Sequence, residues 1–340
     1  MMASLASPDG KSGEWTLHNG QDSAGAPAIA SRLMGRSECD LDLTLGCGQA
    51  FRWKRVDPTD GVAALAGDGP AGSAPSPAQP CWEAVIRGRL VAFWRDDERL
   101  CARMAPGPFD GSLLDHYLDT RIRLADVTRE IAVDPHIVEA LSRYPGLRIV
   151  QQEPWETLIS FILSQWSNVP RISSQVEALS RRYGTEILPG RYAFPRPDQL
   201  ARATVDELRS LGLGYRAEYV RRAARKCDEQ GLDWLQNLSG IEYRTARDLI
   251  VRPFAPGRPS EKVHGVGAKV ADCVLLFSLG HYEAVPVDVH VRRAMERWYG
   301  DQATFTSRYD SVAAFGRLHF GRYAGYAQQY LFHRQREGGA

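Results

Sequence analysis

Apolar and polar residues alternate in the first part of the chain with the period of two that strands show. The alternation runs through 39–45, resumes after a glycine turn through 49–54, and is followed by two short apolar segments, 82–86 and 89–94. Half-buried strands have this pattern because successive side chains point to opposite faces of a sheet. We therefore expect an antiparallel β domain over residues 31–125.

Two stretches of this part show no periodicity. Residues 1–30 are mostly small and polar, which predicts a flexible tail. Residues 57–80 consist largely of Gly, Ala, Pro and Ser. This composition is typical of flexible linkers, so we expect a disordered insertion at the tip of a hairpin.

The apolar spacing changes to about 3.6 residues after residue 112, which is typical of amphipathic helices. Behind Pro154, which suits the first turn of a helix, one apolar stripe runs to Trp166. Residues 268–279 are apolar nearly all round, which predicts a buried helix. The chain is thus expected to be an α+β protein with a larger all-helical body over 126–340. Further helices are expected over 172–183, 205–211, 215–229, 233–238, 243–251, 289–298 and 309–333.

Composition is that of an ordinary globular protein, with 44% apolar and 24% charged residues in a chain of 340. No apolar run approaches the roughly 20 residues that span a bilayer, and the first thirty residues lack the apolar core of a secretory signal. The six cysteines form no CxxC pairs, which indicates free thiols in a reducing compartment and no metal site. We expect an intracellular monomer that contacts no membrane.

Charge is distributed unevenly. The net charge is +1, but residues 1–120 carry −5 and residues 121–340 carry +6, so the second part is the more favourable surface for a polyanion. Only five of the 42 basic residues are lysines. Because arginine offers no free amine at neutral pH, few residues can serve as an amine nucleophile.

One of these lysines follows a glycine turn. Gly265-Val266-Gly267 leads into the apolar segment, where free N–H groups favour an anion such as a DNA phosphate, although most such turns bind nothing. For Lys269 in the first turn, the helix dipole and desolvation disfavour an ammonium and favour a nucleophilic amine. The simpler alternative is a lysine that reaches solvent from a helix end. Asp288, nineteen residues later, is either an N-cap or a carboxylate that stabilises positive charge on a sugar.

With these residues the chain resembles the helix-hairpin-helix, Gly/Pro-Asp superfamily of DNA glycosylases. Within that superfamily it resembles the eukaryotic-type 8-oxoguanine DNA glycosylase/AP lyase. The run GVGAKVADC…AVPVDVHV carries the lysine and the aspartate, in a helix-hairpin-helix region at about 243–300. GQAFRW, SFILSQWSNVPRI, GLGYRAEYV and YAGYAQQYLF are similar to the family's other signatures, in the same order. The resemblance covers about 38–335 and implies an enzyme of base excision repair that binds damaged double-stranded DNA and needs no cofactor.

The resemblance also implies the roles of the reacting groups. Lys269 would attack C1′ of the damaged nucleotide and form a Schiff base that permits β-elimination, and Asp288 would stabilise the oxocarbenium-like transition state. The carbonyl of Gly48 would accept the N7–H that distinguishes 8-oxoguanine from guanine. The flipped base would also be held by Cys273 and Phe332, which would sandwich it, and by Gln328, which would read its Watson–Crick edge.

A set of DNA contacts is implied in the same way. Tyr215 would enter the base stack, and Arg171 and Arg216 would bond the orphaned cytosine. His290 would contact a phosphate near the lesion. The full set is Asn168, Arg171, Tyr215, Arg216, Gly265, Gly267 and His290.

Trp166 departs from the family pattern, which has an asparagine that fills the gap beside the opposite base. An indole can fill that gap by stacking but cannot make the hydrogen bonds of an amide. Alternatively, Trp166 is the last core residue of its apolar stripe. The preference for opposite cytosine is therefore open. Proline-rich 252–262 is a second departure, longer than the family's usual link into the hairpin.

Two other functions also stay open. The first is the same chemistry on a different damaged base. The second is a helix-hairpin-helix DNA-binding module without catalysis, which the presence of both Lys269 and Asp288 disfavours, because a protein that only binds needs neither.

Overall fold

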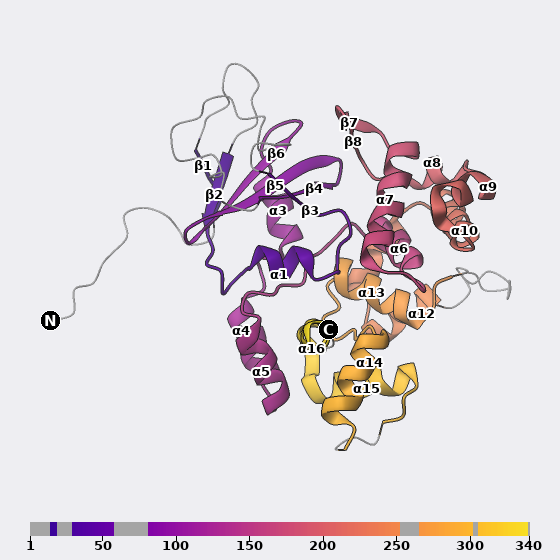
Figure 1. The fold of residues 1–340 in the computed structure, drawn as a ribbon. Coiled ribbons are helices and arrows are strands. Elements are labelled where there is room, and N and C mark those ends of the chain that lie inside the picture. The colour runs from indigo at the N-terminus through magenta and orange to yellow at the C-terminus, as the bar shows by residue number, and fades with distance from the viewer. Residues whose placement is uncertain (1–13, 19–28, 58–80, 252–264, 302–304, 339–340) are drawn as a thin grey trace.

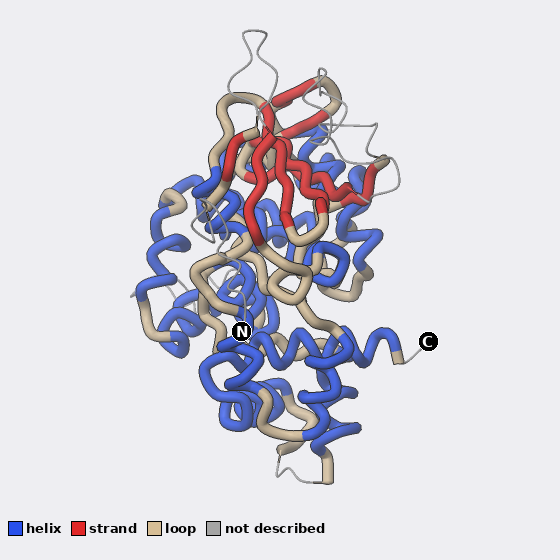
Figure 2. Tube along the Cα trace, turned by 90° about the vertical axis from the view of Figure 1, so that its left-hand side faces the viewer, coloured by secondary structure: helices blue, strands red, loops and turns tan. Residues whose placement is uncertain are grey.

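A computed structural model describes residues 14–18, 29–57, 81–251, 265–301 and 305–338. An antiparallel sheet is followed along the chain by a larger helical body, which confirms the expected α+β class (Figure 1). Figure 2 shows the strands gathered at one end of the molecule, with helices forming the rest. No helix in the described part of the chain is long and apolar enough to cross a membrane.

The sheet has six strands in the order β1-β2-β6-β5-β4-β3, antiparallel throughout. One face packs on helices α1 and α3 through side chains such as Phe93 and Met104, and the opposite face buries residues such as Trp94. The predicted strands 82–86 and 89–94 are confirmed as β4 and β5. The bounds are β1 Thr16–Leu17, β2 Ile29–Leu33, β3 Lys54–Val56, β4 Cys81–Ile86, β5 Arg89–Asp96 and β6 Arg99–Ala105, with α1 Leu41–Gly46 and α3 Gly111–Tyr117.

The strand predicted over 39–45 is wrong, because this segment forms α1. The Asp40 side chain accepts the N–H of Leu43 at 3.0 Å and caps the helix, and Leu41 and Leu45, one turn apart, face the core. In so short a segment, apolar residues at every second position fit one face of a helix as well as one face of a strand. The strand predicted over 49–54 begins only at its last residue, as β3.

The tail predicted over 1–30 is also partly wrong. Thr16 and Leu17 pair with β2, which begins at Ile29. Beside them, the Trp15 indole packs edge-on against Phe109 at 5.5 Å between ring centroids. The aromatic contact and the strand pairing anchor this segment to the sheet. The rest of the predicted tail, residues 58–80 of the predicted insertion and the whole of 252–262 lie outside the described residues.

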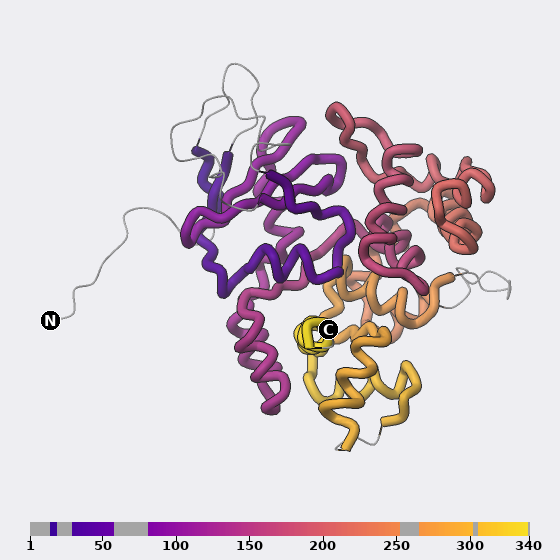
Figure 3. Tube along the Cα trace, in the orientation of Figure 1, coloured from indigo at the N-terminus to yellow at the C-terminus, as the bar shows by residue number. Residues whose placement is uncertain are grey.

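The helical body is built around α6 and α13, which pack against each other and are buried on nearly every face. Phe161 and Phe277 stack at this contact, with ring centroids 5.6 Å apart. The C-terminal helix α16 lies between α4–α5 and α14–α15 (Figure 3). The bounds are α4 Leu124–Ile131, α5 Pro135–Arg143, α6 Pro154–Leu163, α7 Val169–Tyr183, α8 Pro197–Ala201, α9 Val205–Leu208, α10 Arg216–Gln230, α11 Asp233–Gln236, α12 Tyr243–Val251, α13 Ala268–Ser278, α14 Val289–Tyr299, α15 Tyr309–Phe320 and α16 Ala324–Glu337, with a small hairpin of β7 Glu186–Leu188 and β8 Arg191–Tyr192.

Two helix predictions are confirmed nearly residue for residue, whereas the single helix predicted over 309–333 is wrong, because the chain breaks at Gly321, with a φ of +67°, between α15 and α16. Residues 243–251 form α12 as predicted, and 268–279 form α13 to within one residue. The stripe predicted to run to Trp166 ends earlier, because α6 stops at Leu163. Trp166 is 94% exposed, so it is not a core residue.

Candidate active site

The amine of Lys269 lies where α6 and α13 meet. Its Nζ donates a hydrogen bond of 2.9 Å to the Oγ of Ser164, which ends α6. The same nitrogen lies 4.9 Å from the centroid of the Phe161 ring. The amine is therefore held by a neutral hydroxyl and an aromatic face, in a partly buried position at the first turn of α13.

Cys273 lies one turn further along α13 and is buried. Burial raises the pKa of the Cys273 thiol to about 12, although the positive charge of Lys269 acts in the opposite direction. The negative charge of Asp288 raises the pKa of this thiol further. The thiol is therefore protonated at neutral pH and offers an apolar contact rather than a nucleophile. The charges of Lys269 and Asp288 both act on this thiol, so both residues lie near Cys273.

Asp288 is the N-cap of α14. Its Oδ1 accepts the N–H of Val291 at 2.8 Å, which confirms the capping interpretation. Among the described residues no partner takes Oδ2. Capping therefore occupies one oxygen and leaves the other able to face a developing positive charge.

The loop that carries Gly48 lies between α7 and α16. Gly48 has a φ of +92°, a left-handed conformation that glycine adopts without strain. A Cβ at this position would lie 3.2 Å from Cγ2 of Val169. Arg336 of α16 donates a hydrogen bond of 3.0 Å to the neighbouring carbonyl of Cys47. Backbone conformation and close packing both require glycine here.

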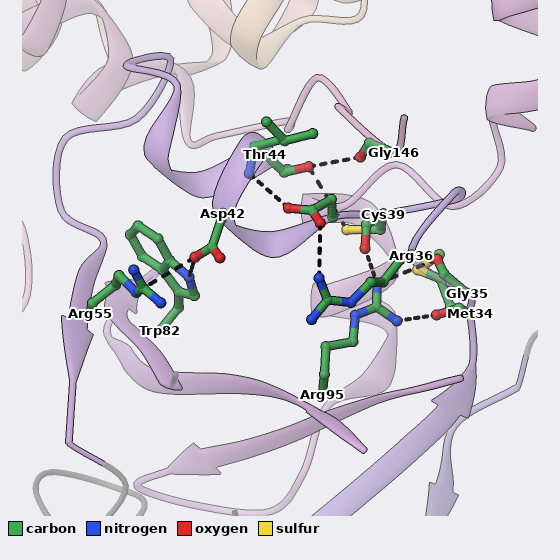
Figure 4. A network of polar contacts seen from close by, with 12 residues as sticks. Met34, Gly35, Arg36, Cys39, Asp42, Thr44, Arg55, Trp82, Arg95 and Gly146 are labelled. Atoms are coloured by element: carbon green, nitrogen blue, oxygen red, sulfur yellow. Dashed lines mark hydrogen bonds and ion pairs between the residues drawn. The ribbon is translucent and has the colours of Figure 1, made fainter. Parts of the chain in front are cut away.

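A network of polar contacts braces α1, the helix that leads into this loop (Figure 4). The buried Arg95 guanidinium donates to the carbonyls of Met34 and Cys39, just before the helix. On the helix itself, Thr44 donates to the carbonyl of Gly146 at 3.2 Å. The indole N–H of Trp82 in turn donates to Asp42, also on α1, at 2.9 Å. The sheet and the helical body thus fix the Gly48 loop from both sides.

Helix α16 supplies the residues expected at the flipped base. Gln328 is buried, and its Oε1 has no hydrogen-bond partner among the described residues. Phe332, one turn later, meets His290 edge-on at 5.8 Å between ring centroids. The Gln329 amide donates to the sulfur of Cys47 at 3.2 Å, which links α16 to the Gly48 loop. An unpaired buried acceptor is costly, so Gln328 is poised to receive a donor.

Two exposed aromatic rings lie at the segment between α6 and α7, one on the segment and one in contact with it. Trp166 has a φ of +50°, which is unusual for a bulky residue. Tyr215, at the start of α10, is 49% exposed, and its hydroxyl donates to the carbonyl of Gln165 at 3.4 Å. The Gln165 amide donates to the carbonyl of Gly265 at 2.7 Å, which ties this segment to the hairpin.

The structure places Arg216 differently from the sequence expectation. Arg216 is only 3% exposed, and its Nε donates to the carbonyl of Gln165 at 2.7 Å. Its Nη2 donates to the carbonyl of Trp166 at 3.0 Å. The guanidinium is therefore engaged by backbone and is not presented at the surface for an orphaned base.

The remaining predicted DNA contacts lie near this segment or on the hairpin. The Asn168 side chain accepts the N–H of Arg171 at 3.0 Å and caps α7, and both residues are exposed. Gly265 has a φ of +87°, and a Cβ there would lie 2.4 Å from Cγ of Tyr219, so only glycine fits. Gly267 is the exposed N-cap of α13 and makes no side-chain cap. The first N–H groups of α13 are thus open to an anion.

A buried cluster fixes the hairpin from behind. The Asp272 carboxylate accepts from the Tyr243 hydroxyl at 2.8 Å and from the Tyr309 hydroxyl at 2.5 Å, and it pairs with Arg247 at 3.1 Å. Burial raises the pKa of the Asp272 carboxyl, while the three partners favour its ionised form. These contacts join α12, α13 and α15, so the position of the α13 N-terminus is set by the core.

Sequence reasoning missed several of these residues. Ser164 and Gln165 lie in a run with a family signature, but their partners are 105 and 100 positions away. No local pattern reveals such contacts. For Asp272, the available signal was a charged residue within an otherwise apolar helix, since such a residue needs partners. In the part of the chain that the structure describes, no group of three or more His, Cys, Asp or Glu residues could hold a metal.

Comparisons with known proteins point to a family of DNA repair proteins. Residues 159–313 match the family model described as HhH-GPD superfamily base excision DNA repair protein, and residues 33–158 match 8-oxoguanine DNA glycosylase, N-terminal domain. The N-glycosylase/DNA lyase OGG1 of Arabidopsis thaliana is 29% identical, over 91% of this chain and 80% of the relative. The probable N-glycosylase/DNA lyase of Methanothermobacter thermautotrophicus is 32% identical, over 61% of this chain and 69% of the relative. A solved structure of MBOgg1 in complex with a low-affinity DNA ligand is similar, with a TM-score of 0.77, 27% identity and coverage of 96% of this chain and 100% of that chain.

Proposed function

Since the chain belongs to the HhH-GPD superfamily of base excision DNA repair proteins, in its 8-oxoguanine DNA glycosylase branch, we propose that it excises 8-oxoguanine from duplex DNA and cleaves the resulting abasic site. The observation that carries the proposal is the Lys269 amine, held 2.9 Å from the Ser164 hydroxyl at the start of a buried helix. A protein that only binds DNA has no use for an amine in this position. The partner is damaged double-stranded DNA, and a monomer inside the cell is expected to carry out the reaction.

The chemistry proceeds in two stages. The neutral Lys269 amine attacks C1′, the bond from C1′ to the base breaks, and the base leaves with the electron pair of that bond and takes up a proton. Transfer of a proton to O4′ then opens the sugar and gives a protonated Schiff base between Nζ and C1′. Removal of a proton from C2′ then expels the 3′ phosphate by β-elimination, and water releases the lysine. No cofactor takes part in these steps.

Asp288 acts on the first stage. Positive charge develops on the sugar as the base departs, and the Oδ2 that capping leaves open is the group that would stabilise it. Because the helix N–H of Val291 fixes Oδ1, the carboxylate needs no reorganisation when the charge appears.

The base is selected by the braced Gly48 loop and α16. The Gly48 carbonyl accepts the N7–H of 8-oxoguanine, a donor that guanine lacks. The unpaired Gln328 Oε1 accepts from the Watson–Crick edge. The ring of Phe332 and the thiol of Cys273 contact the faces of the base. Such a pocket rejects a base that leaves a buried acceptor unpaired.

The backbone of the DNA is held by the hairpin at Gly265 and Gly267 and by the exposed residues around it. The open N–H groups at the start of α13 bind a phosphate, and His290, Arg171 and Asn168 contact the strand near the lesion. Extrusion of a base costs a few kcal/mol, and these contacts together with the aromatic rings offset that cost.

Borohydride trapping tests the proposal. Wild-type protein is mixed with a duplex that carries 8-oxoguanine opposite cytosine, and borohydride reduces any Schiff base to a permanent covalent complex. We expect a complex with the wild type and none with Lys269→Gln, whereas Lys54→Gln, on an exposed lysine of the β domain, traps as well as the wild type.

The other outcomes are equally informative. Trapping on an abasic duplex but not on 8-oxoguanine would keep the lysine chemistry and assign it to a different damaged base. Absence of trapping on both duplexes would overturn the proposal and leave a DNA-binding module without catalysis.

A further inference from the structure

Arg336 lies on α16 one turn beyond Phe332 and about two turns beyond Gln328. Its Nη1 donates a hydrogen bond of 3.0 Å to the carbonyl of Cys47. The same nitrogen lies 3.5 Å from the position that a Cβ on Gly48 would take. The guanidinium carbon lies 5.5 Å from the centroid of the Phe332 ring. The side chain is therefore next to both the loop and the ring that are proposed to hold the flipped base.

The guanidinium of Arg336 keeps most of its hydrogen-bonding capacity. An arginine carries several N–H donors in a planar fork and has no acceptor. Among the described residues, Arg336 makes one hydrogen bond, the one from Nη1 to Cys47, and no carboxylate pairs with it. The residue is exposed, so its remaining donors can reach a ligand. A fixed positive charge with open donors thus stands beside the proposed base site.

The proposed orientation of the base brings one of its atoms to this side chain. Gln328 accepts from the Watson–Crick edge, and the Gly48 carbonyl accepts the N7–H. In 8-oxoguanine, O8 is the atom next to N7 on the side away from the Watson–Crick edge. Along α16, Arg336 lies beyond Phe332 on the side away from Gln328. The oxygen that oxidation adds to the base therefore faces Arg336.

We propose that Arg336 is a specificity-determining residue whose guanidinium donates a hydrogen bond to O8 of the damaged base, beside the Gly48 carbonyl that accepts the N7–H. The inference rests on the proposed function. Guanine has a C8–H in place of O8 and offers no acceptor there, and its N7 carries no proton for the Gly48 carbonyl. A donor and an acceptor side by side therefore match 8-oxoguanine at both oxidised positions and guanine at neither.

A base analogue distinguishes recognition of O8 from positioning of the loop. 8-Thio-7,8-dihydroguanine keeps the N7–H and replaces O8 with sulfur, a weak acceptor. Loss of a hydrogen bond from a charged group should make single-turnover excision of 8-oxoguanine by Arg336→Leu slower by about 10- to 150-fold. The ratio of the 8-oxo rate to the 8-thio rate should fall by about fivefold or more, because any shift of the Gly48 loop slows both bases alike and cancels in the ratio. Arg336→Lys, which keeps the charge, should restore part of the ratio.

Two controls accompany this measurement. Arg129→Leu makes the same change of charge on an exposed side chain of α4 and should leave both rates and their ratio as in the wild type. Cleavage of a preformed abasic site by Arg336→Leu should be nearly unchanged, because that site carries no base. A loss on the abasic duplex as large as the loss on 8-oxoguanine would assign Arg336 to the DNA backbone and overturn the inference.

Binding by Lys269→Gln, which lacks the amine, gives a readout that needs no excision. This variant should bind a duplex with 8-oxoguanine more tightly than one with the 8-thio base, and adding Arg336→Leu should remove the difference. If borohydride trapping succeeds and Arg336→Leu leaves the 8-oxo to 8-thio ratio unchanged, recognition of O8 is wrong and the proposed function stands. If trapping fails on every duplex while the binding preference still depends on Arg336, the glycosylase is rejected and recognition of O8 stands.

Discussion

The loop that carries Gly48 and the turn that carries Trp166 are both assigned to the binding of damaged DNA, but they are stabilised differently. The loop is braced by buried polar contacts from the sheet, from α16 and from the helical body, and it leaves a backbone carbonyl and the Gln328 amide for a base edge. The turn is held by the Arg216 guanidinium through its carbonyls and by the Gln165 amide, which donates to Gly265, and it presents an exposed ring. A rigid pocket with polar groups selects a base by hydrogen bonds, whereas an exposed aromatic ring recognises a base only by stacking. The loop is therefore suited to selecting the damaged base, and the turn offers a stacking surface to the DNA.

Lys269 and Asp288, on α13 and α14, carry the proposed reaction that both regions serve, so the largest effect is expected there. Asp288→Asn keeps the N-cap, because asparagine caps as well as aspartate, but it removes the charge. We expect base release to fall by about 10²- to 10⁴-fold, the range for removing a group that assists proton or charge movement in the transition state. The melting temperature should change little. Asp110→Asn, on the cap of α3, is the control and should leave the rate unchanged.

Gly48→Ala tests the loop that carries Gly48. The added methyl group would occupy a left-handed backbone and press on Val169, so the loop must shift. We expect excision of 8-oxoguanine to fall on the order of 10- to 100-fold, since small displacements at a reacting centre have effects of this size. Cleavage of a preformed abasic site should be nearly unchanged.

The Gly88→Ala variant distinguishes the cost of backbone strain from the effect of displacing the Gly48 loop. Gly88 also has a positive φ, but no atom lies within 4 Å of an added Cβ. Both variants should lose about 1–2 kcal/mol of stability from the backbone alone. A Gly88→Ala variant that loses excision as strongly as Gly48→Ala would show that global destabilisation, and not the loop, sets the rate.

A smaller effect is expected for Ser164→Ala, at the hydrogen bond that positions the amine. Loss of a single neutral hydrogen bond is worth about 0.5–1.5 kcal/mol, so both excision and lyase rates should fall by about two- to tenfold. Trapping should persist, because the amine remains. Ser142→Ala, in an exposed helix away from the site, serves as the control. Equal loss in both variants would contradict the positioning role.

Glu156→Gln is expected to have the smallest effect on activity and to change the stability of the fold instead. Glu156 pairs with Arg52, beyond the Gly48 loop, at 3.7 Å, and burial raises the pKa of its carboxyl from 4.5 to about 7. The folded protein therefore holds a proton that the unfolded chain releases, so stability decreases as pH rises from about 4.5 through 7. The whole difference amounts to about 3 kcal/mol. Denaturant unfolding at pH 5 and pH 8 should show a smaller decrease for the glutamine variant, and an equal decrease would contradict the shift.

Apolar spacing predicted where the helices lie, but it missed the break between α15 and α16 and failed in short segments. Residues 243–251 and 268–278 are helical because several turns of apolar spacing leave no other interpretation. Residues 39–45 were misassigned because leucines at 41, 43 and 45 fit both a strand and a helix, and only the Asp40 cap decides between them. Strand β6 escaped notice because its arginines interrupt the apolar pattern.

The sequence names candidate residues for the site but does not give their contacts. Lys269 and Asp288 were identified from their types, spacing and resemblance. The burial of Arg216 under the carbonyls of a turn 50 positions away was not predictable, because it depends on the tertiary path of two helices. The same holds for Trp166, which continues an apolar stripe in the sequence but lies beyond the end of the helix in space.

Asp288 both caps a helix and supplies a charge, so inherited substitutions at this position affect two properties of the protein. The carboxylate that starts α14 is the same one proposed to face the sugar, so most substitutions at this position remove a helix cap along with the charge. Such alleles would reduce the amount of protein as well as its activity, and a screen for abundance alone would detect them. Asparagine is the exception, since it would leave a full complement of protein that occupies lesions without repairing them. Among substitutions at this position, the best-tolerated one structurally would thus be the most harmful to a genome.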